Sequence, residues 1–295
     1  MTTAPLPFTS AVIGDDGQAG GERALQVAAA LAANFGTKLH VVHALDVPAP
    51  DGTGGPLTDI ANHTASMAEA ATQRIQDRAD AFLGAGVAGV QVELGRPHSA
   101  LIRAARSIGA DLILLGPHTK QHFFDLGGTQ RAVFSGAHCH IWSQPTEPRP
   151  ITRILAPCDL SAPSMAALHA ARDLALHRGV PVNVLHVSQP PALFDPMTQG
   201  SADLMVPSYV VDGLHEAIQA QFEEKMEAVD WTGVEHTREF VVGSTISAIE
   251  QARREGDLTV MGTHGHTGLS AAILGGVTHA LLKQASGPLL ALRPD

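Results

Sequence analysis

Hydrophobic and polar residues follow two patterns along the chain. Short runs that are almost wholly apolar, such as "VNVLHV" at 182–187 and "DLTVMG" at 257–262, predict strands of a parallel sheet covered on both faces. Longer stretches between them carry apolar residues on one helical face. In the second half of the chain these patterns predict strands near 151–157, 181–187, 235–242, 257–262 and 288–292, and helices near 161–178, 208–228, 245–255 and 275–286. This alternation indicates right-handed crossovers and a doubly wound α/β sheet.

The same pattern occurs twice, because the chain is a repeat. Residues 11–48 align with residues 154–191 without a gap, and this alignment matches Asp16 with Asp159 and His43 with His186. The later parts of the two copies also match, with small differences in length. The join, "SQPTEPRP" at 143–150, is rich in proline and lacks apolar periodicity, which is typical of a linker. We therefore predict two α/β domains, at 1–146 and 150–295.

Two further segments, 48–63 and 189–207, follow the second strand of each copy and are rich in proline and glycine. Long connections of this kind either cover binding sites or lack order. The sequence leaves both interpretations open.

Composition and charge exclude several classes of protein. A formal net charge of -10 and a pI near 5.8 argue against a general binder of nucleic acids or anionic membranes. No apolar run reaches the roughly 18–20 residues that span a bilayer, and "MTTAPLPFTS" lacks the features of a signal peptide. Two cysteines are too few for a disulfide framework or a cysteine-based zinc site. We therefore expect a cytoplasmic protein.

In doubly wound sheets the ligand lies beyond the carboxyl ends of the strands. The most informative strand exit is "MGTHGHTGLSAAILGG" at 261–276, which contains Gly262, Gly265, Gly275 and Gly276. Glycines let backbone N–H groups approach an anion, and the last two open a predicted helix whose dipole favours phosphate. The segment is neither a Walker A loop nor a dinucleotide fingerprint. It predicts a phosphate cradle.

The spacing Gly-x2-Gly-x9-Gly after the strand "LTVMGTHG", with an Asp at the exit of the repeat's first strand, resembles the universal stress protein family. The segment from Gly95 to Gly116 adds to the match. Both halves are covered, so the chain is similar to a tandem universal stress protein. The resemblance implies two doubly wound parallel-sheet sandwiches in tandem, of the adenine nucleotide alpha hydrolase type. It also implies a stress-response protein that binds ATP or a related adenine nucleotide, with or without Mg²⁺.

The resemblance further implies which residues bind phosphate. In the ATP-binding branch of the family the glycine loop wraps the phosphates, so Gly262, Gly265, Gly275 and Gly276 would face the triphosphate through their N–H groups. Gly276 stands where the family usually has Ser or Thr, so one hydroxyl is missing. Losing one hydrogen bond costs about 1 kcal/mol, which weakens binding without abolishing it. Thr278 is a candidate substitute.

The resemblance also assigns the nucleoside end of the site. Asp159 would accept a hydrogen bond from the nucleoside, and Val187 would offer backbone contacts to the adenine. Ala156 and Pro157 would line the base pocket. An alternative role for Asp16 and Asp159 is to cap the following helix, although Ser161 also fits that role in the second copy.

The first copy departs further from the pattern. Its loop, "LGPHTKQHFFDLGGTQRAVF", keeps Gly116 and Gly128 but has Thr119 in place of the second glycine, and Pro117 removes one backbone donor. We expect this degenerate domain to bind nucleotide weakly or not at all and to serve as the paired partner of the second.

Sixteen histidines invite a metal hypothesis. A zinc site needs three or four converging ligands, whereas the histidine pairs 118/122, 138/140 and 264/266 are dispersed, so we predict no metal site. His264 and His266 either donate to phosphate or face solvent. His43 and His186 recur at matching strand ends and are expected to pack there.

The sequence has no nucleophile elbow, paired catalytic carboxylates or Cys/His pair, so we do not expect an enzyme, although slow ATP hydrolysis stays open. The leading hypothesis is a nucleotide-dependent regulator or sensor. One alternative is an interaction protein in which both sites are degenerate and "PLLALRP" pairs with "CHIWSQP", giving an intramolecular pseudo-dimer or a homodimer. Another is a small-molecule carrier with the segments 48–63 and 189–207 as lids.

Overall fold

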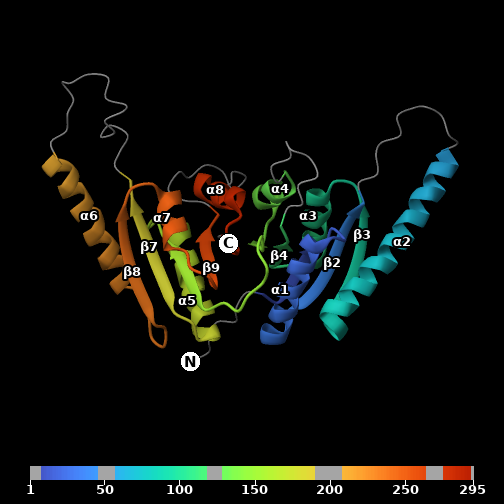
Figure 1. Cartoon of the computed structure of the whole chain (residues 1–295), viewed down its shortest axis with the longest axis horizontal. Helices are drawn as coiled ribbons and strands as arrows, with labels where there is room; N and C mark the ends of the chain where they lie inside the picture. The colour runs from blue at the N-terminus through green and yellow to red at the C-terminus, as the bar shows by residue number, and fades with distance from the viewer. Residues whose placement is uncertain (1–7, 46–56, 118–127, 190–207, 264–274, 294–295) are drawn as a thin grey trace, which may run out of the picture. The chain divides into compact units, whose positions relative to one another are not determined.

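The computed structural model describes residues 8–45, 57–117, 128–189, 208–263 and 275–293. Contacts divide the chain into two compact units (Figure 1). Of the described residues, unit 1 contains those up to Arg149 together with Leu282–Arg293. Unit 2 contains the others, from Pro150 to Leu281.

Unit 1 is built on a sheet with the strand order β3-β2-β1-β4-β5-β10. The first five strands pair in parallel, and β10 pairs antiparallel with β5. The order reverses between β1 and β4, as in other doubly wound folds. Its elements are β1 (Ser10–Gly14), α1 (Ala19–Phe35), β2 (Lys38–Leu45), α2 (Leu57–Leu83), the short 3₁₀ helix η1 (Gly84–Gly86), β3 (Val87–Leu94), α3 (Pro97–Ile108), β4 (Leu112–Leu115), α4 (Gly128–Gly136), β5 (His140–Ser143) and β10 (Leu289–Leu292).

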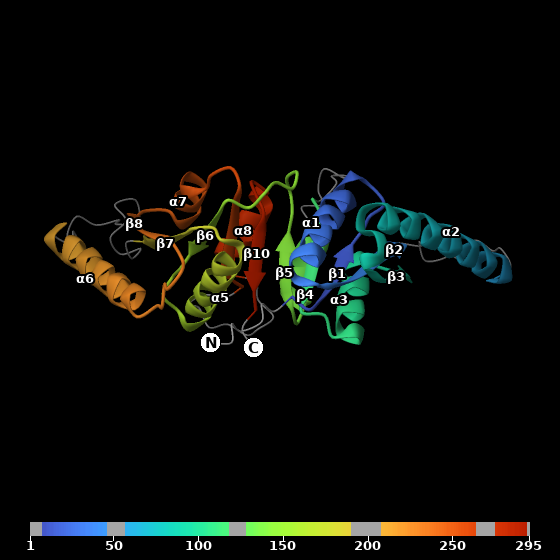
Figure 2. The same cartoon turned by 90° about the horizontal axis from the view of Figure 1, so that it is seen from below.

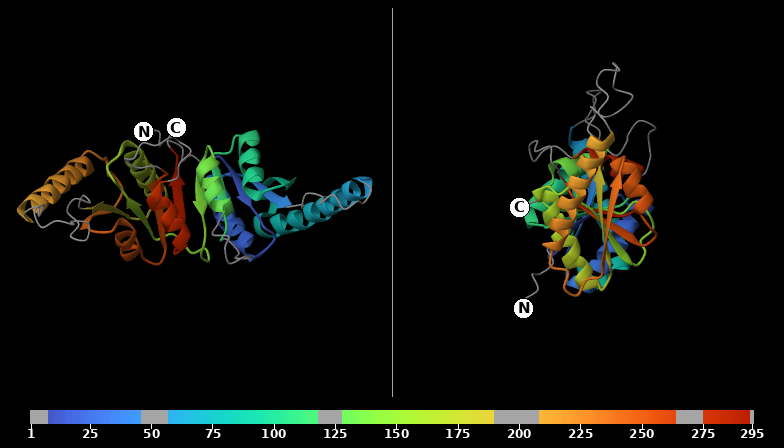
Figure 3. Two further views of the ribbon diagram at one scale, coloured as in Figure 1. Left: turned by 90° about the horizontal axis from the view of Figure 1, so that it is seen from above. Right: turned by 90° about the vertical axis from the view of Figure 1, so that its left-hand side faces the viewer.

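Unit 2 repeats this plan with the parallel strand order β9-β6-β7-β8. Helices α5 and α6 lie on one face of its sheet and α7 lies on the other, which Figures 2 and 3 show from opposite directions. Its elements are β6 (Arg153–Pro157), α5 (Ala162–Arg178), β7 (Val182–Ser188), α6 (Ser208–Glu227), β8 (His236–Val242), α7 (Thr245–Ala252) and β9 (Asp257–Gly262), with α8 (Gly276–Gln284) crossing the division between the units.

The predicted fold class is confirmed: both units are α/β with parallel strands and crossover helices. The apolar runs "VNVLHV" and "DLTVMG" form β7 and β9, whose residues are almost all buried. The pairing predicted between the last strand and "CHIWSQP" is also confirmed, because Leu290 lies opposite Trp142 in the ladder of β10 and β5. The second repeat therefore supplies the last strand of the sheet of unit 1.

Helix α7 ends earlier than predicted, at Ala252 rather than near 255. Arg253 takes an extended conformation, and Gly256 has a φ of 84°, a value that favours glycine, so the chain turns directly into β9. The helical pattern of the sequence thus extends a few residues beyond the true end of the helix.

The starts of α1 and α5 differ although they occupy the same place in the repeat. Ser161 is the N-cap of α5, and its hydroxyl accepts a hydrogen bond from the Ser164 N–H at 3.3 Å. Gln18, the N-cap of α1, makes no such contact. Asp16 caps α1 instead, because its Oδ1 accepts hydrogen bonds from the N–H groups of Gln18 at 2.8 Å and Gly21 at 3.0 Å. The capping role that the sequence allowed for both aspartates is therefore used in unit 1.

None of the helices in the described part of the chain is long and apolar enough to cross a membrane.

Candidate functional site

Unit 2 contains a pocket of about 400 Å³ at the carboxyl ends of its strands. One wall is the exit of β6, with Pro157, Cys158 and Asp159, together with Ser164 on α5. The exit of β7 contributes Leu185, Val187 and Gln189, and Thr245 at the start of α7 adjoins them. The exit of β9 and the start of α8 form the remaining wall, which consists of Met261–Thr263 and Gly275–Thr278. The pocket lies where doubly wound folds bind their ligands.

The structure brings together most of the residues that the sequence singled out. The pocket is lined by Pro157, Asp159, Val187, Gly262, Gly275, Gly276 and Thr278. Ala156 does not line it, because its side chain points into the core and is 1% exposed. His264, Gly265 and His266 lie outside the described residues.

Asp159 faces the pocket and is not needed to cap α5. One carboxylate oxygen, Oδ1, accepts hydrogen bonds from the Ser161 N–H at 3.0 Å and the Ser161 hydroxyl at 2.5 Å. Ser161 in turn caps the helix. The two bonds fix the carboxylate at the mouth of the strand exit, where it can act as an oriented acceptor.

The glycine-rich end of the pocket is built from backbone. The Gly275 N–H donates to Thr263 O at 3.0 Å and joins the two ends of the segment between β9 and α8. The His279 N–H donates to Gly275 O at 3.0 Å, so hydrogen bonding within α8 begins there. The N–H groups of Gly276 and Val277 belong to the first helical turn, the part of a helix that binds anions.

Thr278 lies beneath this end of the pocket and is 2% exposed. Its hydroxyl lies 3.4 Å from Gly262 O and 3.8 Å from Met261 Sδ. In unit 1 the Gln130 side chain donates to Gly116 O, at 2.9 Å, from the same position of its helix. Contact with the strand exit is therefore a shared structural role of Thr278 and Gln130.

Several lining residues were missed by the sequence reasoning, namely Cys158, Ser164, Gln189 and Thr245. The motifs of the sequence lie at the exits of the first, second and fourth strands. Thr245 follows the third strand, β8, and the signal that could have found it is that all strand exits of a parallel sheet meet at one edge.

The Cys158 thiol is buried and is not activated as a nucleophile. Burial raises its pKa, and its sulfur contacts the Ser164 hydroxyl at 3.4 Å and Met165 Sδ at 3.7 Å. A neutral buried thiol contributes packing to the pocket wall rather than nucleophilic chemistry.

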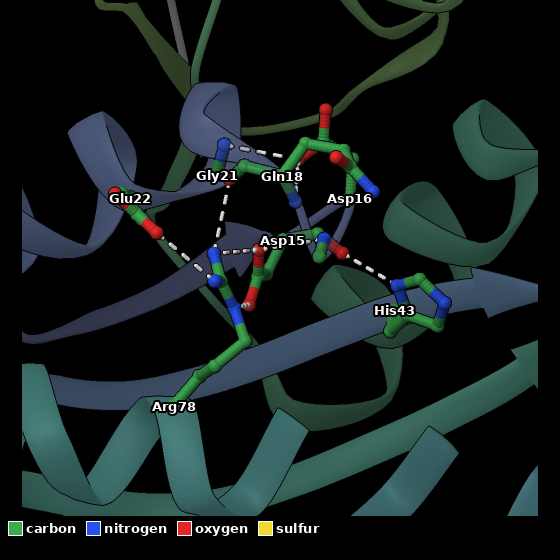
Figure 4. A network of polar contacts seen from close by, with 8 residues as sticks. Asp15, Asp16, Gln18, Gly21, Glu22, His43 and Arg78 are labelled. Carbon is green, nitrogen blue, oxygen red and sulfur yellow. Dashed lines mark hydrogen bonds and ion pairs between the residues drawn. The ribbon is translucent and has the colours of Figure 1, made fainter. Parts of the chain in front are cut away.

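An ion pair lies at the corresponding strand exit of unit 1. Asp15 occupies the position of Cys158 in the repeat, and its side chain is fully buried. Arg78 on α2 donates from Nε to Asp15 Oδ2 at 3.0 Å and from Nη2 to Asp15 Oδ1 at 3.2 Å (Figure 4). Its other donors reach Gln18 O at 3.0 Å and Glu22 Oε1 at 3.1 Å. These contacts, chiefly the hydrogen bonds with Asp15, raise the pKa of the Arg78 guanidinium.

Two close backbone approaches complete this closure. A Cβ atom on Gly116, at the exit of β4, would lie 1.8 Å from Gly20 O. A Cβ atom on Gly21, which corresponds to Ser164 in unit 2, would lie 1.9 Å from Asp15 Oδ1. The start of α1, the exit of β4 and the Asp15 carboxylate thus pack closely against one another.

The recurring histidines have the packing role expected of them. His43 Nδ1 lies 2.7 Å from Asp15 O, and His186 Nδ1 lies 2.7 Å from Cys158 O. His186 also stacks between Phe222 and Phe240, with ring centroids 5.5 and 5.6 Å away. Each histidine thus connects the second strand of its unit, through its ring nitrogen, to a backbone carbonyl at the exit of the first strand.

No group of three or more potential metal ligands occurs among the residues that the structure describes. Of the histidine pairs, 118/122 and 264/266 lie outside those residues. His140 is engaged structurally, because its Nδ1 accepts a hydrogen bond from the Arg293 N–H at 3.1 Å.

Comparison with known proteins identifies the family. The model of the universal stress protein family matches residues 7–142 and again residues 150–293. The chain belongs to the universal stress protein family. It contains two family domains in tandem, as the sequence predicted.

Solved structures share the fold over nearly the whole length. A universal stress protein from Archaeoglobus fulgidus is 15% identical, with a TM-score of 0.61, and the match covers 97% of this chain and 98% of that one. A functionally unknown protein, PA1789, from Pseudomonas aeruginosa PAO1 is 18% identical, with a TM-score of 0.60 and coverage of 98% and 93%. The sequence matches no curated protein.

Proposed function

We propose that unit 2 of this stress-response protein binds ATP or a related adenine nucleotide, and that the protein acts as a nucleotide-dependent regulator or sensor. The observation that carries the proposal is the pocket that joins Asp159, the exit glycine Gly262 and the first turn of α8. It combines an oriented carboxylate with backbone donors at a helix N-terminus. The first suits a ribose hydroxyl and the second suits phosphate.

The order of the strands gives the bound nucleotide a direction. In the sheet of unit 2 the carboxyl ends of the strands lie side by side in the order β9, β6, β7. Phosphates would lie at Gly262, Gly275 and Gly276, the ribose at Asp159, and the base against Leu185 and Val187 beyond β7. Helix N–H groups can hold an anion although the net charge of the chain is -10, because a phosphate responds to the donors within a few ångströms.

Unit 1 takes no nucleotide in this proposal. Its strand exit is filled by the ion pair of Arg78 and Asp15, and Gly116 packs directly on Gly20. The second repeat supplies β10 to the sheet of unit 1, which supports an intramolecular pair of repeats. We further propose that the protein acts in the cytoplasm and that signalling, rather than catalysis, is its main role.

Cysteine protection tests the site within a single chain. Cys158 lines the pocket of unit 2, and Cys139 is a buried cysteine of unit 1 whose pKa is raised to about 12, mainly by burial. Saturating ATP with Mg²⁺ is expected to slow alkylation of Cys158 at least several-fold and to leave Cys139 unchanged, because a ligand stabilises only the unit that binds it. Peptide mass spectrometry after a timed reaction with N-ethylmaleimide measures both rates.

Equal Cys158 rates with and without ATP, together with no heat of binding by calorimetry, would remove support for a nucleotide site. Protection of both cysteines to the same extent would point instead to a general effect of ATP on the chain.

Restoring the missing hydroxyl should strengthen binding. A Cβ atom at Gly276 would meet no atom of the described residues within 4 Å, so Gly276→Ser fits these surroundings. One added hydrogen bond to phosphate contributes about 1 kcal/mol, which corresponds to a roughly fivefold lower Kd for ATP. Calorimetric titration of the wild type, Gly276→Ser and Gly276→Ala measures this, and an alanine variant that binds as tightly as the serine variant would contradict a phosphate contact at this position.

A further inference from the structure

A side-chain pair closes the end of the pocket away from the glycines. The Gln189 Nε2 donates a hydrogen bond to the Thr245 hydroxyl oxygen at 2.8 Å. Gln189 follows the last residue of β7, Thr245 begins α7, and both line the pocket. The pair therefore links the exits of two neighbouring strands across the pocket edge.

The fold does not need this pair in order to join the two exits. A backbone hydrogen bond from the Gly243 N–H to Ser188 O, 3.0 Å long, already connects them. Unit 1 has the equivalent bond, from the Gly95 N–H to Leu45 O at 2.8 Å. The first repeat has Pro97 at the position of Thr245, which cannot accept from a side-chain amide as a hydroxyl does. The side-chain pair of unit 2 is therefore additional to a backbone connection that both units share.

The position of the pair determines which part of a ligand it would meet. The glycines lie at the exit of β9, Asp159 at the exit of β6, and Gln189 beyond β7, in the order of the strands. If phosphate lies at the glycines, as the proposed function requires, the base lies at the Gln189 end. Leu185 and Val187 provide an apolar wall for the flat ring there.

Thr245 fixes the orientation of the Gln189 amide. A glutamine side chain offers both an N–H₂ donor and a carbonyl acceptor. With its nitrogen on the Thr245 hydroxyl, the amide keeps its carbonyl oxygen and one N–H for a ligand, and the carbonyl oxygen is the group that would pair with the edge of the base. A carbonyl acceptor matches the 6-amino group of adenine, whereas the 6-oxo group of hypoxanthine or guanine would bring two acceptors together.

We propose that Gln189, oriented by Thr245, is the specificity-determining residue of the pocket and selects nucleotides whose base carries an amino group at this edge, that is, adenine over hypoxanthine and guanine nucleotides. The inference rests on the proposed function of unit 2.

The test compares ATP with ITP, which differ in the 6-amino and 6-oxo groups and at N1, where the hypoxanthine ring of ITP carries a hydrogen. Wild-type protein is expected to bind ATP at least about tenfold more tightly than ITP, because a missing hydrogen bond and an unpaired acceptor both penalise ITP. Gln189→Ala should reduce this preference to less than about threefold. Thr245→Val, which removes the anchor of the amide, should reduce it partly, whereas Gln189→Glu keeps an acceptor and should keep the preference.

Gln251→Ala is the matched control. Gln251 is an exposed glutamine of α7 that bonds Ser247 at 2.9 Å, outside the pocket, so its replacement should leave both affinities unchanged. Calorimetric titration measures each Kd. Wild-type protein that binds ATP and ITP equally, or Gln189→Ala with an undiminished preference, would overturn the inference while leaving nucleotide binding in place. If the wild type binds neither nucleotide, the proposed function itself is wrong.

Discussion

Replacing Arg78 with methionine is expected to lower the free energy of unfolding of unit 1 by about 3–5 kcal/mol, because the change leaves a buried carboxylate without its counter-ion. The Asp15 side chain is fully buried, and the Arg78 side chain is 19% exposed. Arg78 also donates to Gln18 O and Glu22, so its removal frees the start of α1 at two points. Methionine fills most of the volume of the arginine stem and isolates the loss of charge from the loss of packing.

The two tryptophans of the chain allow each unit to be followed separately. Trp142 lies in β5 of unit 1 and Trp231 lies in unit 2. In a Trp231→Phe background, fluorescence during urea unfolding reports the transition of unit 1 through Trp142. The free energy from linear extrapolation of this transition is the quantity compared between variants.

A double variant and a matched variant in unit 2 serve as controls. Asp15→Asn with Arg78→Met removes both charges and keeps an acceptor for the Gly17 N–H, which donates to Asp15 Oδ1 at 2.9 Å. It should recover a large part of the lost stability, as removing the second member of a buried pair does. Alignment of the buried residues Ile75 and Ala79 with Phe222 and Met226 places Lys225 at the position of Arg78.

Lys225→Met is expected to cost less than about 1 kcal/mol, since the residue that corresponds to Asp15 in unit 2 is Cys158, whose neutral thiol offers no charge to pair with. A loss below about 1 kcal/mol in Arg78→Met, or a double variant no more stable than Arg78→Met alone, would show that the ion pair does not hold unit 1 together.

Most of the fold could be predicted because the repeat provides two copies of the same pattern of strands and helices. Apolar runs such as "VNVLHV" have few alternatives to a buried strand, and the two copies agree on the order of elements. The end of α7 was missed, since the helical pattern continues to 255 and only the backbone at Arg253 and Gly256 decides where it stops. Helix ends depend on single residues, whereas whole elements depend on many.

The candidate site was predictable where a residue type carries its own signal, as with the glycines and Asp159. The contrast between Asp16 and Asp159 was also present in the sequence, because Ser161 can cap a helix and Gln18, its counterpart, is a poor cap. The closure of unit 1 was not predictable in this way. The loop with Thr119 lies outside the described residues, whereas the carboxylate at the exit of β1 pairs with an arginine from α2. Sequence patterns report local periodicity and contain little information on which distant side chains meet.

Gly116→Ala is expected to destabilise unit 1 by about 3 kcal/mol or more, through overpacking against backbone that cannot rotate away. The added Cβ would lie 1.8 Å from Gly20 O and 2.5 Å from the Gly20 carbonyl carbon, far inside van der Waals contact. Gly276→Ala at the start of α8 is the matched control, since among the described residues its Cβ meets no atom within 4 Å and alanine favours a helix. The stability of unit 2 should stay the same or rise by a few tenths of a kcal/mol. Urea unfolding followed through Trp142 for the first variant and Trp231 for the second measures both effects.

The outcome also bears on function. The exit of β4 can open a ligand site only by moving away from the start of α1, and the cost of Gly116→Ala measures how firmly that contact is held. A loss below about 1 kcal/mol would mean that the exit shifts easily from Gly20. Unit 1 could then form a pocket like that of unit 2, and the proposal that a single unit of the tandem chain binds nucleotide would lose its main structural support.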